Sequence, residues 1–327
     1  MPVNHITREQ LLAALRSQGA KDQEGWTSGE ALASGIGLSR VAVWKAAQAL
    51  KEAGYPIESS KKGYRLRETK SFDALSPWEF PGHTEHIHLW QHTTSTMDRA
   101  RELALKGEGD GTIAIAETQE AGRGRQGRSW QSNNGGLFFT LIRRPKLAAQ
   151  AYLRAVFATQ LACARAIERF IDRPVALSWP NDLLVEGRKI GGVLAEFWAR
   201  GDYIDWIGLG VGINVLNREE GAASLSEWST ASSRREVLAA ILEEFKQGET
   251  ADFTHPDLLR AWEARLVEKG KRVALSTPFH RGSKSPNDTE ELTLLGVDSL
   301  GRCRVKGREG IREYGPAECS LVPLSPH

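Results

Sequence analysis

The sequence lacks three features that would place a chain of 327 residues in a specialised class. No apolar run approaches the ~18 residues of a membrane-spanning helix, so no membrane span is expected. The N-terminus has no charged start followed by an apolar run, which predicts no secretory signal peptide. Cysteine is scarce: Cys163, Cys303 and Cys319 form an odd set without C-x-x-C spacing, which argues against a disulfide framework or a zinc site. A cytoplasmic protein with reduced thiols is expected.

Strong net charge is also absent, since the formal net charge is +2, but the charges are unevenly distributed. Residues 1–67 contain ten Lys or Arg against six Asp or Glu, and residues 39–67 alone contain seven against two. Positive charge gathered in one small segment suggests a polyanionic partner. The length and a hydrophobic content of 40% predict two or three globular domains.

The basic segment contains three helix starts. Thr7 with Gln10, and Thr27 with Glu30, have the spacing of capping boxes, so helices are expected to follow Thr7 and Thr27. Ser39 is expected to cap a third helix, whose apolar residues recur at helical spacing and would pack inward. Two helices, a tight turn and a third helix with a basic face predict a helix-turn-helix. The inward residues of the third helix are Val43, Ala46, Ala47 and Leu50.

A hairpin is expected after the third helix, with strands 57–59 and 64–66 around a turn that carries two lysines. Such a wing suits contact with DNA phosphates, and the third helix would enter the major groove. A winged helix that serves protein contacts is the alternative, but the positive charge lies where this fold would present it to DNA. The predicted DNA-binding residues are Arg40, Trp44, Lys45, Gln48, Lys61 and Lys62.

The remaining chain divides into a linker, a sheet domain and a small β domain. Residues 68–84 shift toward polar residues and prolines, which indicates a linker. Apolar strands are expected at residues 112–116, 137–142, 175–178, 192–197 and 204–211, and Ser95 is expected to cap a helix that follows it. Strands and helices mixed in this way over residues 85–271 predict an α/β or α+β sheet domain. Several short strands separated by glycine turns follow over residues 272–327 and suggest a small barrel.

The most distinctive segment is G-R-G-R-Q-G-R-S-W at residues 122–130, which we call the arginine–glycine loop. Gly122, Gly124 and Gly127 formally satisfy the G-x-G-x-x-G dinucleotide fingerprint, but the following S-W-Q-S-N-N-G-G cannot open the helix that the fingerprint needs. Glycine lets the backbone approach a ligand closely, and arginine supplies forked donors that match carboxylate and phosphate oxygens. The loop is therefore predicted to order over an anion, with a solvated basic loop as the alternative.

Two further segments could contribute to the same site. W-P-N-D at residues 179–182 places Asn181 and Asp182 at the end of a strand, where polar groups can face a ligand or a metal. Lys189 precedes a glycine pair and a new strand, and it is either a surface residue or a fixed positive charge in a pocket. Alternating glycines at residues 208–212 of an apolar strand indicate close approach by another group, unless they form a turn.

Together these segments resemble the biotin protein ligases, in particular the bifunctional kind that also represses the biotin operon. The matching motifs are G-R-G-R-Q-G-R-x-W at residues 122–130, W-P-N-D-L at 179–183, G-R-K-I-G-G-V-L-x-E at 187–196 and G-I-N at 212–214. Ser39-Arg40 and Gly63-Tyr64 match the head of the repressor type. The resemblance covers nearly the whole chain and implies an α+β multidomain protein. Its parts would be a winged helix over 1–67, a linker over 68–84, a central mixed β-sheet core of the biotin/lipoate ligase, class II synthetase-like type over 85–271, and an SH3-like β-barrel over 272–327.

The resemblance also implies an activity that uses biotin, ATP and Mg²⁺. Biotin and Mg-ATP would form biotinyl-5′-AMP, and a lysine of the biotin carboxyl carrier protein, an acetyl-CoA carboxylase subunit, would then attack the acyl carbon. A carboxylate that attacks a phosphate brings two anions together, and fixed positive charge offsets their repulsion. The adenylate-bound protein would be a homodimer that binds operator DNA and represses biotin-synthesis genes.

Residue roles follow from the resemblance motif by motif, while the metal ligands stay unassigned. The catalytic residues would be Lys189, Arg123 and Asp182. The biotin-binding residues would be Ser95, Thr96, Gln119, Gly122, Arg123, Gly124, Lys189 and Gly192. The ATP-binding residues would be Arg123, Arg125, Arg128, Trp130, Asn181, Lys189, Asn214 and Trp228.

Several positions depart from the family pattern. Ser178 stands where lysine is usual, so one positive charge near the site is missing, and Met97 stands where asparagine is frequent. Trp44 replaces a residue that is often polar, so an operator sequence cannot be transferred. Residues 277–289, rich in Ser, Lys and Pro, are expected to form a flexible loop that touches the carrier. The alternatives are a lipoate–protein ligase, which shares the core fold, and a ligand-sensing transcription factor with an inactive core.

Overall fold

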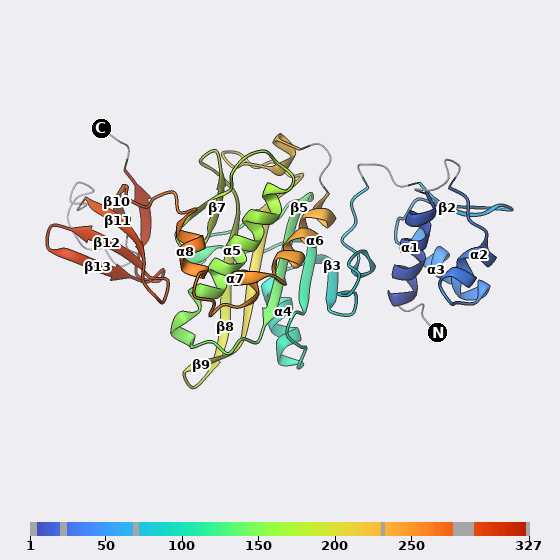
Figure 1. The fold of residues 1–327 in the computed structure, drawn as a ribbon, viewed down its shortest axis with the longest axis horizontal. Helices are drawn as coiled ribbons and strands as arrows, with labels where there is room; N and C mark the ends of the chain where they lie inside the picture. The colour runs from blue at the N-terminus through green and yellow to red at the C-terminus, as the bar shows by residue number, and fades with distance from the viewer. Residues whose placement is uncertain (1–4, 20–24, 68–71, 230–232, 277–290, 325–327) are drawn as a thin grey trace. The chain divides into compact units, whose positions relative to one another are not determined.

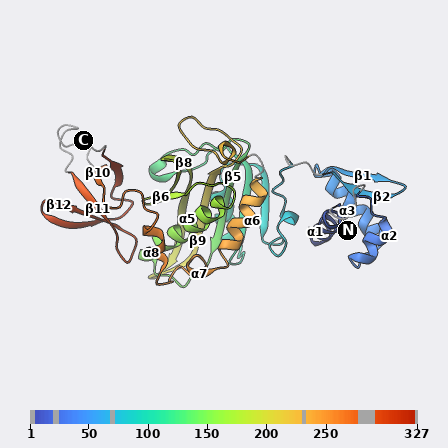
Figure 2. The same cartoon turned by 45° about the horizontal axis from the view of Figure 1, so that its top comes forward.

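The computed structural model describes residues 5–19, 25–67, 72–229, 233–276 and 291–324. The chain divides into two compact units, Met1–Leu89 and Trp90–His327, which Figures 1 and 2 show as ribbons. The predicted flexible loop 277–289 and the first residues of the predicted linker, 68–71, lie outside the described ranges. None of the helices in these ranges has the length and apolar character of a membrane-spanning segment.

Three helices and a two-stranded hairpin form the first unit, as predicted. Ser39 caps the third helix, because its Oγ accepts a hydrogen bond from Ala42 N at 3.1 Å. All four predicted inward residues of that helix are buried. The strands of the hairpin pair in antiparallel register around Lys61 and Lys62. The elements are α1 (His5–Gly19), α2 (Gly29–Gly35), α3 (Arg40–Glu52), β1 (Ile57–Ser60) and β2 (Gly63–Leu66).

The two other predicted helix starts are wrong. Helix α1 begins at His5, so Thr7 lies inside the helix and not at its cap. Ser28 and not Thr27 caps α2, since Ser28 Oγ accepts a hydrogen bond from the backbone N–H three residues on at 3.0 Å. The backbone of Thr27 is already paired with Tyr64 of the hairpin through two hydrogen bonds of 2.9 Å. A tertiary contact has therefore moved the cap by one residue.

Residues 72–84, predicted to be part of a linker, belong to the first unit and pack against its core. Glu79 is buried, and its carboxylate accepts a hydrogen bond from Tyr55 at 2.5 Å. Burial, followed by the negative charge of Glu79, raises the pKa of Tyr55. The ring of His5, at the start of α1, lies edge-on against Trp78 with ring centroids 5.6 Å apart.

The second unit is built on a seven-stranded mixed sheet with the order β3-β4-β5-β9-β8-β7-β6. The five pairings from β4 to β6 are antiparallel, and β3 lies beside β4 at one edge. The strands predicted from apolar patterning are all present, whereas β3 and β7 were not predicted. The strands are β3 (Ile87–Thr93), β4 (Ile113–Gln119), β5 (Gly136–Arg143), β6 (Ala176–Ser178), β7 (Asp182–Val185), β8 (Arg188–Arg200) and β9 (Tyr203–Asn214).

Helices cover this sheet, and α5 packs against α6, α7 and α8. The ring of Phe157 in α5 stacks on Trp262 of α8 with centroids 3.9 Å apart, and both side chains are fully buried. Figure 2 shows α5, α6 and α7 in front of the sheet, where they cover one of its faces. Ser95 caps α4, as predicted. The helices are α4 (Thr96–Leu105), α5 (Leu153–Glu168), α6 (Arg234–Glu244), α7 (Gly248–Ala251) and α8 (Leu258–Glu263).

The C-terminal strands form a five-stranded antiparallel sheet with the order β13-β12-β11-β10-β14. The indole Nε1 of Trp179 donates a hydrogen bond of 3.0 Å to Gly301 O, which joins this sheet to the W-P-N-D segment. Cys163, Cys303 and Cys319 are buried free cysteines. The strands are β10 (Arg272–Ser276), β11 (Leu292–Val297), β12 (Cys303–Gly307), β13 (Gly310–Tyr314) and β14 (Ser320–Pro323).

Candidate functional site

A cavity of about 230 Å³ lies beneath the arginine–glycine loop. Segments that are far apart in the sequence line it: the start of α4, the end of β4, the loop, strands β5 to β9, and the start of β14. Four cationic side chains and one carboxylate are among the lining residues, so the cavity is suited to an anionic ligand. The predicted site residues in the lining are Ser95, Thr96, Gln119, Arg123, Gly124, Arg125, Arg128, Trp130, Asn181, Asp182, Lys189 and Gly192.

The floor of the cavity is a connected set of small polar groups. Thr96 N donates to Gln119 Oε1 at 2.7 Å, and Gln119 Nε2 donates to Ser132 Oγ at 2.8 Å. The hydroxyl of Thr140 donates to the hydroxyl of Thr96 at 2.9 Å. Ser95 Oγ accepts a hydrogen bond from Met97 N as the cap of α4. These contacts fix the orientation of each hydroxyl and amide that a ligand would meet.

Side chains from other elements pack closely against the alternating glycines of β9, as the pattern of glycines predicted. A Cβ atom at Gly208 or Gly210 would lie 2.9 Å from the side chain of Met97. A Cβ atom at Gly212 would lie 2.7 Å from the indole of Trp130. Met97, one of the departures from the family pattern, therefore fills space that this glycine strand leaves open.

The arginine–glycine loop closes on itself through its backbone. Trp130 N donates to Gly122 O at 2.8 Å, and Gly124 N donates to Arg128 O at 2.7 Å. Gly122 itself does not line the cavity, but a Cβ atom there would lie 2.5 Å from Trp130 O, so this closure requires glycine. Only a short 3-10 turn forms inside the loop, and the next regular element is the strand β5. The dinucleotide fingerprint is therefore excluded on structural grounds as well.

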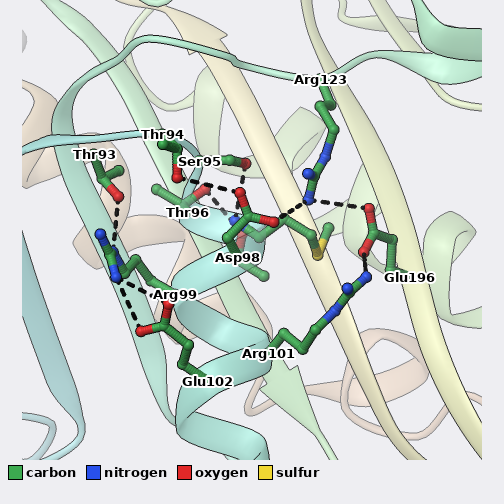
Figure 3. A network of polar contacts seen from close by, with 12 residues as sticks. Thr93, Thr94, Ser95, Thr96, Asp98, Arg99, Arg101, Glu102, Arg123 and Glu196 are labelled. Carbon is green, nitrogen blue, oxygen red and sulfur yellow. Dashed lines mark hydrogen bonds and ion pairs between the residues drawn. The ribbon is translucent and has the colours of Figure 1, made fainter.

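The three arginines of the loop have different partners. Arg123 reaches Asp98 at 2.8 Å and Glu196 at 3.3 Å, as Figure 3 shows. Arg125 donates to two backbone carbonyls of the C-terminal segment, those of Pro316 at 2.6 Å and Cys319 at 3.4 Å. Burial lowers the pKa of Arg125. Arg128 is exposed, and its guanidinium donates a hydrogen bond to the neutral side chain of Gln126.

Lys189 and Asp182 form an ion pair in the cavity, with 2.7 Å between Nζ and Oδ1. A register shift between β7 and β8 pairs Leu184 with Lys189 while Asp182 pairs with Gly192. The extra residue of this bulge, Ile190, turns Lys189 to the same face of the sheet as Asp182, which a regular strand would not do. The spacing left open whether Lys189 is a surface residue or a pocket cation, and the register makes it a pocket cation.

Two polar atoms of this cluster are buried without a well-aligned hydrogen bond among the described residues. One is Asp182 Oδ1, whose contact with Lys189 is an ion pair of short distance only. The other is the indole Nε1 of Trp130. The ammonium of Lys189 lies 5.1 Å from the ring centroid of Trp130. Buried polar atoms of this kind are the groups that a bound ligand can satisfy.

Two predicted ATP-binding residues do not line the cavity. Asn214 is buried and donates to Ala223 O at 3.1 Å, which makes it a structural link in the loop after β9. The guanidinium of Arg188 lies over the ring of Trp228, 5.4 Å from its centroid, and Arg188 also forms an ion pair with Glu227. Their roles toward ATP remain predictions.

Sequence reasoning missed several lining residues. Thr140 occupies a buried position of β5, and a polar residue in an apolar strand was the available signal. Ser320 and Leu321 come from the C-terminal sheet, and no sequence signal links them to the loop. Ser178, which the sequence already placed near the site, does line the cavity, but its hydrogen bond to the buried carboxyl of Glu268 had no sequence signal.

The described residues contain no group of three or more His, Cys, Asp or Glu side chains that could hold a metal ion. Asp182 is the one carboxylate among the described lining residues of the cavity. The described residues thus provide a single carboxylate ligand for a metal ion at this cavity.

The first unit presents a separate candidate interface with DNA. The side chains on the outer face of α3 include Val41, which is 62% exposed, and Trp44, which is 53% exposed. These two residues and Arg40 line a shallow groove with Lys61 at the tip of the hairpin. Of the six predicted DNA-binding residues, Gln48 is half-buried and the other five are exposed.

The comparisons with known proteins agree with this arrangement. Residues 89–214 match the Biotin/lipoate A/B protein ligase family, and residues 8–65 match a helix-turn-helix (HTH) domain. The chain is 31% identical to the bifunctional ligase/repressor BirA of Bacillus subtilis over 313 residues, which are 90% of this chain and 93% of that protein. It is 28% identical over 239 residues to a biotin–[acetyl-CoA-carboxylase] ligase of Paracoccus denitrificans, covering 69% of this chain and 95% of that protein.

Among solved structures, the chain is similar to the biotin protein ligase of Aquifex aeolicus in complex with biotin and ATP. The TM-score is 0.58 at 27% identity, and the match covers 73% of this chain and 100% of that chain. The relative from Bacillus subtilis spans both the helix-turn-helix unit and the ligase unit. The chain therefore belongs to the biotin/lipoate protein ligase family, in the group of bifunctional ligase/repressors that carry a helix-turn-helix domain.

Proposed function

We propose that this chain is an ATP-dependent biotin protein ligase that also represses transcription through its helix-turn-helix domain. The observation that carries the ligase half is the cation-lined cavity beneath the arginine–glycine loop in a chain of this family. The intact Lys189–Asp182 pair disfavours a ligand sensor with an inactive core, because sensing alone needs no such pair. The printed name of the Bacillus relative supports both halves.

In the first step, an oxygen of the biotin carboxylate attacks the α-phosphorus of ATP, pyrophosphate leaves, and biotinyl-5′-AMP forms. Both reactants are anions, so fixed positive charge at their meeting point lowers the barrier. Lys189 is placed to supply it, because the bulge in β8 directs its ammonium into the cavity. Arg128 has only a neutral partner in the described structure, so its charge is available to a phosphate.

The polar floor is proposed to bind the ureido end of biotin. A ureido group has two N–H donors and one carbonyl acceptor, and the hydroxyls of Ser95 and Thr96 with the amide of Gln119 offer matching partners. The buried indole N–H of Trp130 is a further donor toward the ligand. Asn181 lines the cavity on the side of Asp182, which favours the predicted place for the nucleotide.

Magnesium is proposed to enter with ATP. Mg²⁺ is usually held by one or two carboxylates, several waters and substrate phosphates, and Asp182 can be that carboxylate. When bound, the ion would neutralise phosphate charge.

In the second step, the amine of the carrier lysine attacks the acyl carbon of biotinyl-5′-AMP, the bond from that carbon to the phosphate oxygen breaks, and AMP leaves. The incoming ammonium must lose a proton before it can attack. Asp182 is the one carboxylate among the described lining residues of the cavity, so it can orient this ammonium and accept its proton.

Mass spectrometry of a carrier domain tests the ligase half. Incubation of the chain with biotin, Mg-ATP and a biotin carboxyl carrier domain should add one biotinyl group to the carrier lysine. The same mixture without ATP, or with lipoate in place of biotin, should add nothing. Transfer of lipoate at a comparable rate would instead support a lipoate–protein ligase, and no transfer of either acid would refute the ligase proposal.

A gel-shift experiment tests the repressor half. Biotin with ATP should tighten binding to DNA upstream of biotin-synthesis genes, and sedimentation should show dimers of the adenylate-bound chain. Binding that is independent of biotin and ATP would contradict ligand-controlled repression.

A further inference from the structure

The guanidinium of Arg123 forms ion pairs with two carboxylates from different elements. Asp98 comes from the first turn of α4 and Glu196 from β8, at 2.8 Å and 3.3 Å from Arg123 Nη2. Figure 3 shows the guanidinium between the two carboxylates. The three side chains are between 27% and 39% exposed, so solvent screens this network only in part.

The two carboxylates are themselves anchored. Thr94 donates to the second oxygen of Asp98 at 3.2 Å, next to the Ser95 cap of α4 on the cavity floor. Arg101 donates to the second oxygen of Glu196 at 2.8 Å. The network therefore joins the loop to the helix that begins at the cavity floor and to the strand that carries Lys189.

We propose that Asp98 and Glu196 are positioning residues that hold the arginine–glycine loop over the cavity through Arg123. Arg123 then acts as a strut that places the loop backbone, and its charge is neutralised before any anion arrives. The positive charge for the ligand comes instead from Arg128, whose described side-chain partner is neutral, and from Lys189, which has one carboxylate partner where Arg123 has two. This inference rests on the proposed function only where it concerns retention of biotinyl-5′-AMP.

The proposal predicts the opposite sign from direct ligand binding by Arg123. If Arg123 bound the ligand, removal of its two carboxylate partners would free the guanidinium and slow the release of the adenylate. If Arg123 is a strut, the same change loosens the loop and speeds release. Loss of ion pairs of this exposure corresponds to about threefold for one partner and about tenfold for both.

Limited trypsin digestion of the full chain without ligand tests the strut directly. Trypsin must bind the side chain of Arg123 to cut the bond after it, so this cut reports release of the guanidinium. Cleavage there, measured by mass spectrometry relative to cleavage after the exposed Arg218, should rise about threefold in Asp98→Asn or Glu196→Gln and about tenfold in the double variant. Asp98→Glu should restore protection in part.

Two variants serve as matched controls. Glu102→Gln, on the same helix as Asp98, removes a carboxylate that pairs with Arg99 and not with Arg123. Asp257→Asn removes an exposed carboxylate that pairs with Arg260 and not with Arg123. Neither should raise cleavage after Arg123. Unchanged cleavage in the Asp98 and Glu196 variants would overturn the proposal.

The release rate of biotinyl-5′-AMP is the second measurement. Release should be faster in both carboxylate variants while the rate of pyrophosphate formation stays within about twofold of the parent chain. Slower release would overturn the proposal in favour of direct binding by Arg123. If the parent chain formed no adenylate, the proposed function would fail, and the digestion without ligand would still decide whether Asp98 and Glu196 hold the loop.

Discussion

The ammonium of Lys189 lies 2.7 Å from Oδ1 of Asp182 because a bulge at Ile190 turns both side chains to one face of the sheet. The pair lies in the cavity and not in the core, since each side chain is more than 30% exposed. A pair with that exposure contributes little to the free energy of unfolding, so its effects should appear in the chemistry.

Replacement of Lys189 by alanine should therefore reduce adenylation far more than stability. We expect pyrophosphate release to fall by about 10²–10³ in kcat, and the free energy of unfolding to change by less than about 1 kcal/mol. Single-turnover pyrophosphate assays and urea unfolding measure the two quantities. Lys106→Ala, at an exposed position after α4, is the control. Normal pyrophosphate release by Lys189→Ala would remove Lys189 from the mechanism.

Arg125 should matter more for stability than Arg128, its neighbour in the loop. Arg125 is partly buried and donates to two carbonyls of the C-terminal segment, whereas Arg128 is exposed. Hydrogen bonds from a charged donor contribute about 1.5–3 kcal/mol, so Arg125→Ala should lower the free energy of unfolding by roughly that amount. Arg128→Ala should lower it by less than about 0.5 kcal/mol. Equal losses in urea titrations would show that the contact with the C-terminal segment is unimportant.

The wing lysines should contribute to DNA affinity without sequence preference. Lys61 and Lys62 form the exposed tip of the hairpin. If each neutralises one phosphate, replacement of both by alanine should reduce the slope of log affinity against log salt concentration by about 2. Fluorescence anisotropy at several salt concentrations, with operator and unrelated DNA, measures this slope. A loss confined to operator DNA would mean that the lysines read bases.

The buried carboxyl of Glu268 should make stability depend on pH. Burial raises its pKa above the ordinary value of 4.5, and the hydrogen bond from Ser178 only partly opposes this shift. The folded state then retains the proton to higher pH than the unfolded state. The free energy of unfolding therefore falls as the pH rises above 4.5 through the raised pKa.

Glu268→Gln removes this titration, so the stability of the variant relative to the parent chain should be greater at about pH 7.5 than at about pH 5. Thermal unfolding at the two pH values measures the gain. Glu309→Gln, at an exposed position, should show no such trend. A stability difference that is the same at both pH values would refute the linkage.

Local signals predicted the parts of the fold that local energetics decide. The caps at Ser39 and Ser95 and the inward face of α3 were read from residues within one helical turn. The cap at Thr27 was wrong because its backbone pairs with Tyr64, 37 positions further along the chain. Spacing within a segment cannot reveal a competitor that distant.

In the candidate site, too, local sequence predicted the motifs but not the contacts that depend on the tertiary fold. The arginine–glycine loop and the W-P-N-D segment were recognisable from their residues, and the structure brings them to one cavity. The partners of Arg123 and Arg125 were not predicted, because Glu196 and Pro316 lie on elements that only the tertiary fold brings close. The orientation of Lys189 depends on a one-residue bulge, and the residue types in that stretch did not allow this bulge to be predicted.

The three glycines of β9 have a consequence for the shape of the cavity. Met97 and Trp130 occupy the space where side chains at positions 208, 210 and 212 would stand. An added methyl group at any of them would lie 2.7 to 2.9 Å from one of these two side chains, which is closer than van der Waals contact, so that side chain would have to move. Alanine at any of these three positions should therefore displace Met97 or Trp130 and change the shape of the cavity that both side chains line.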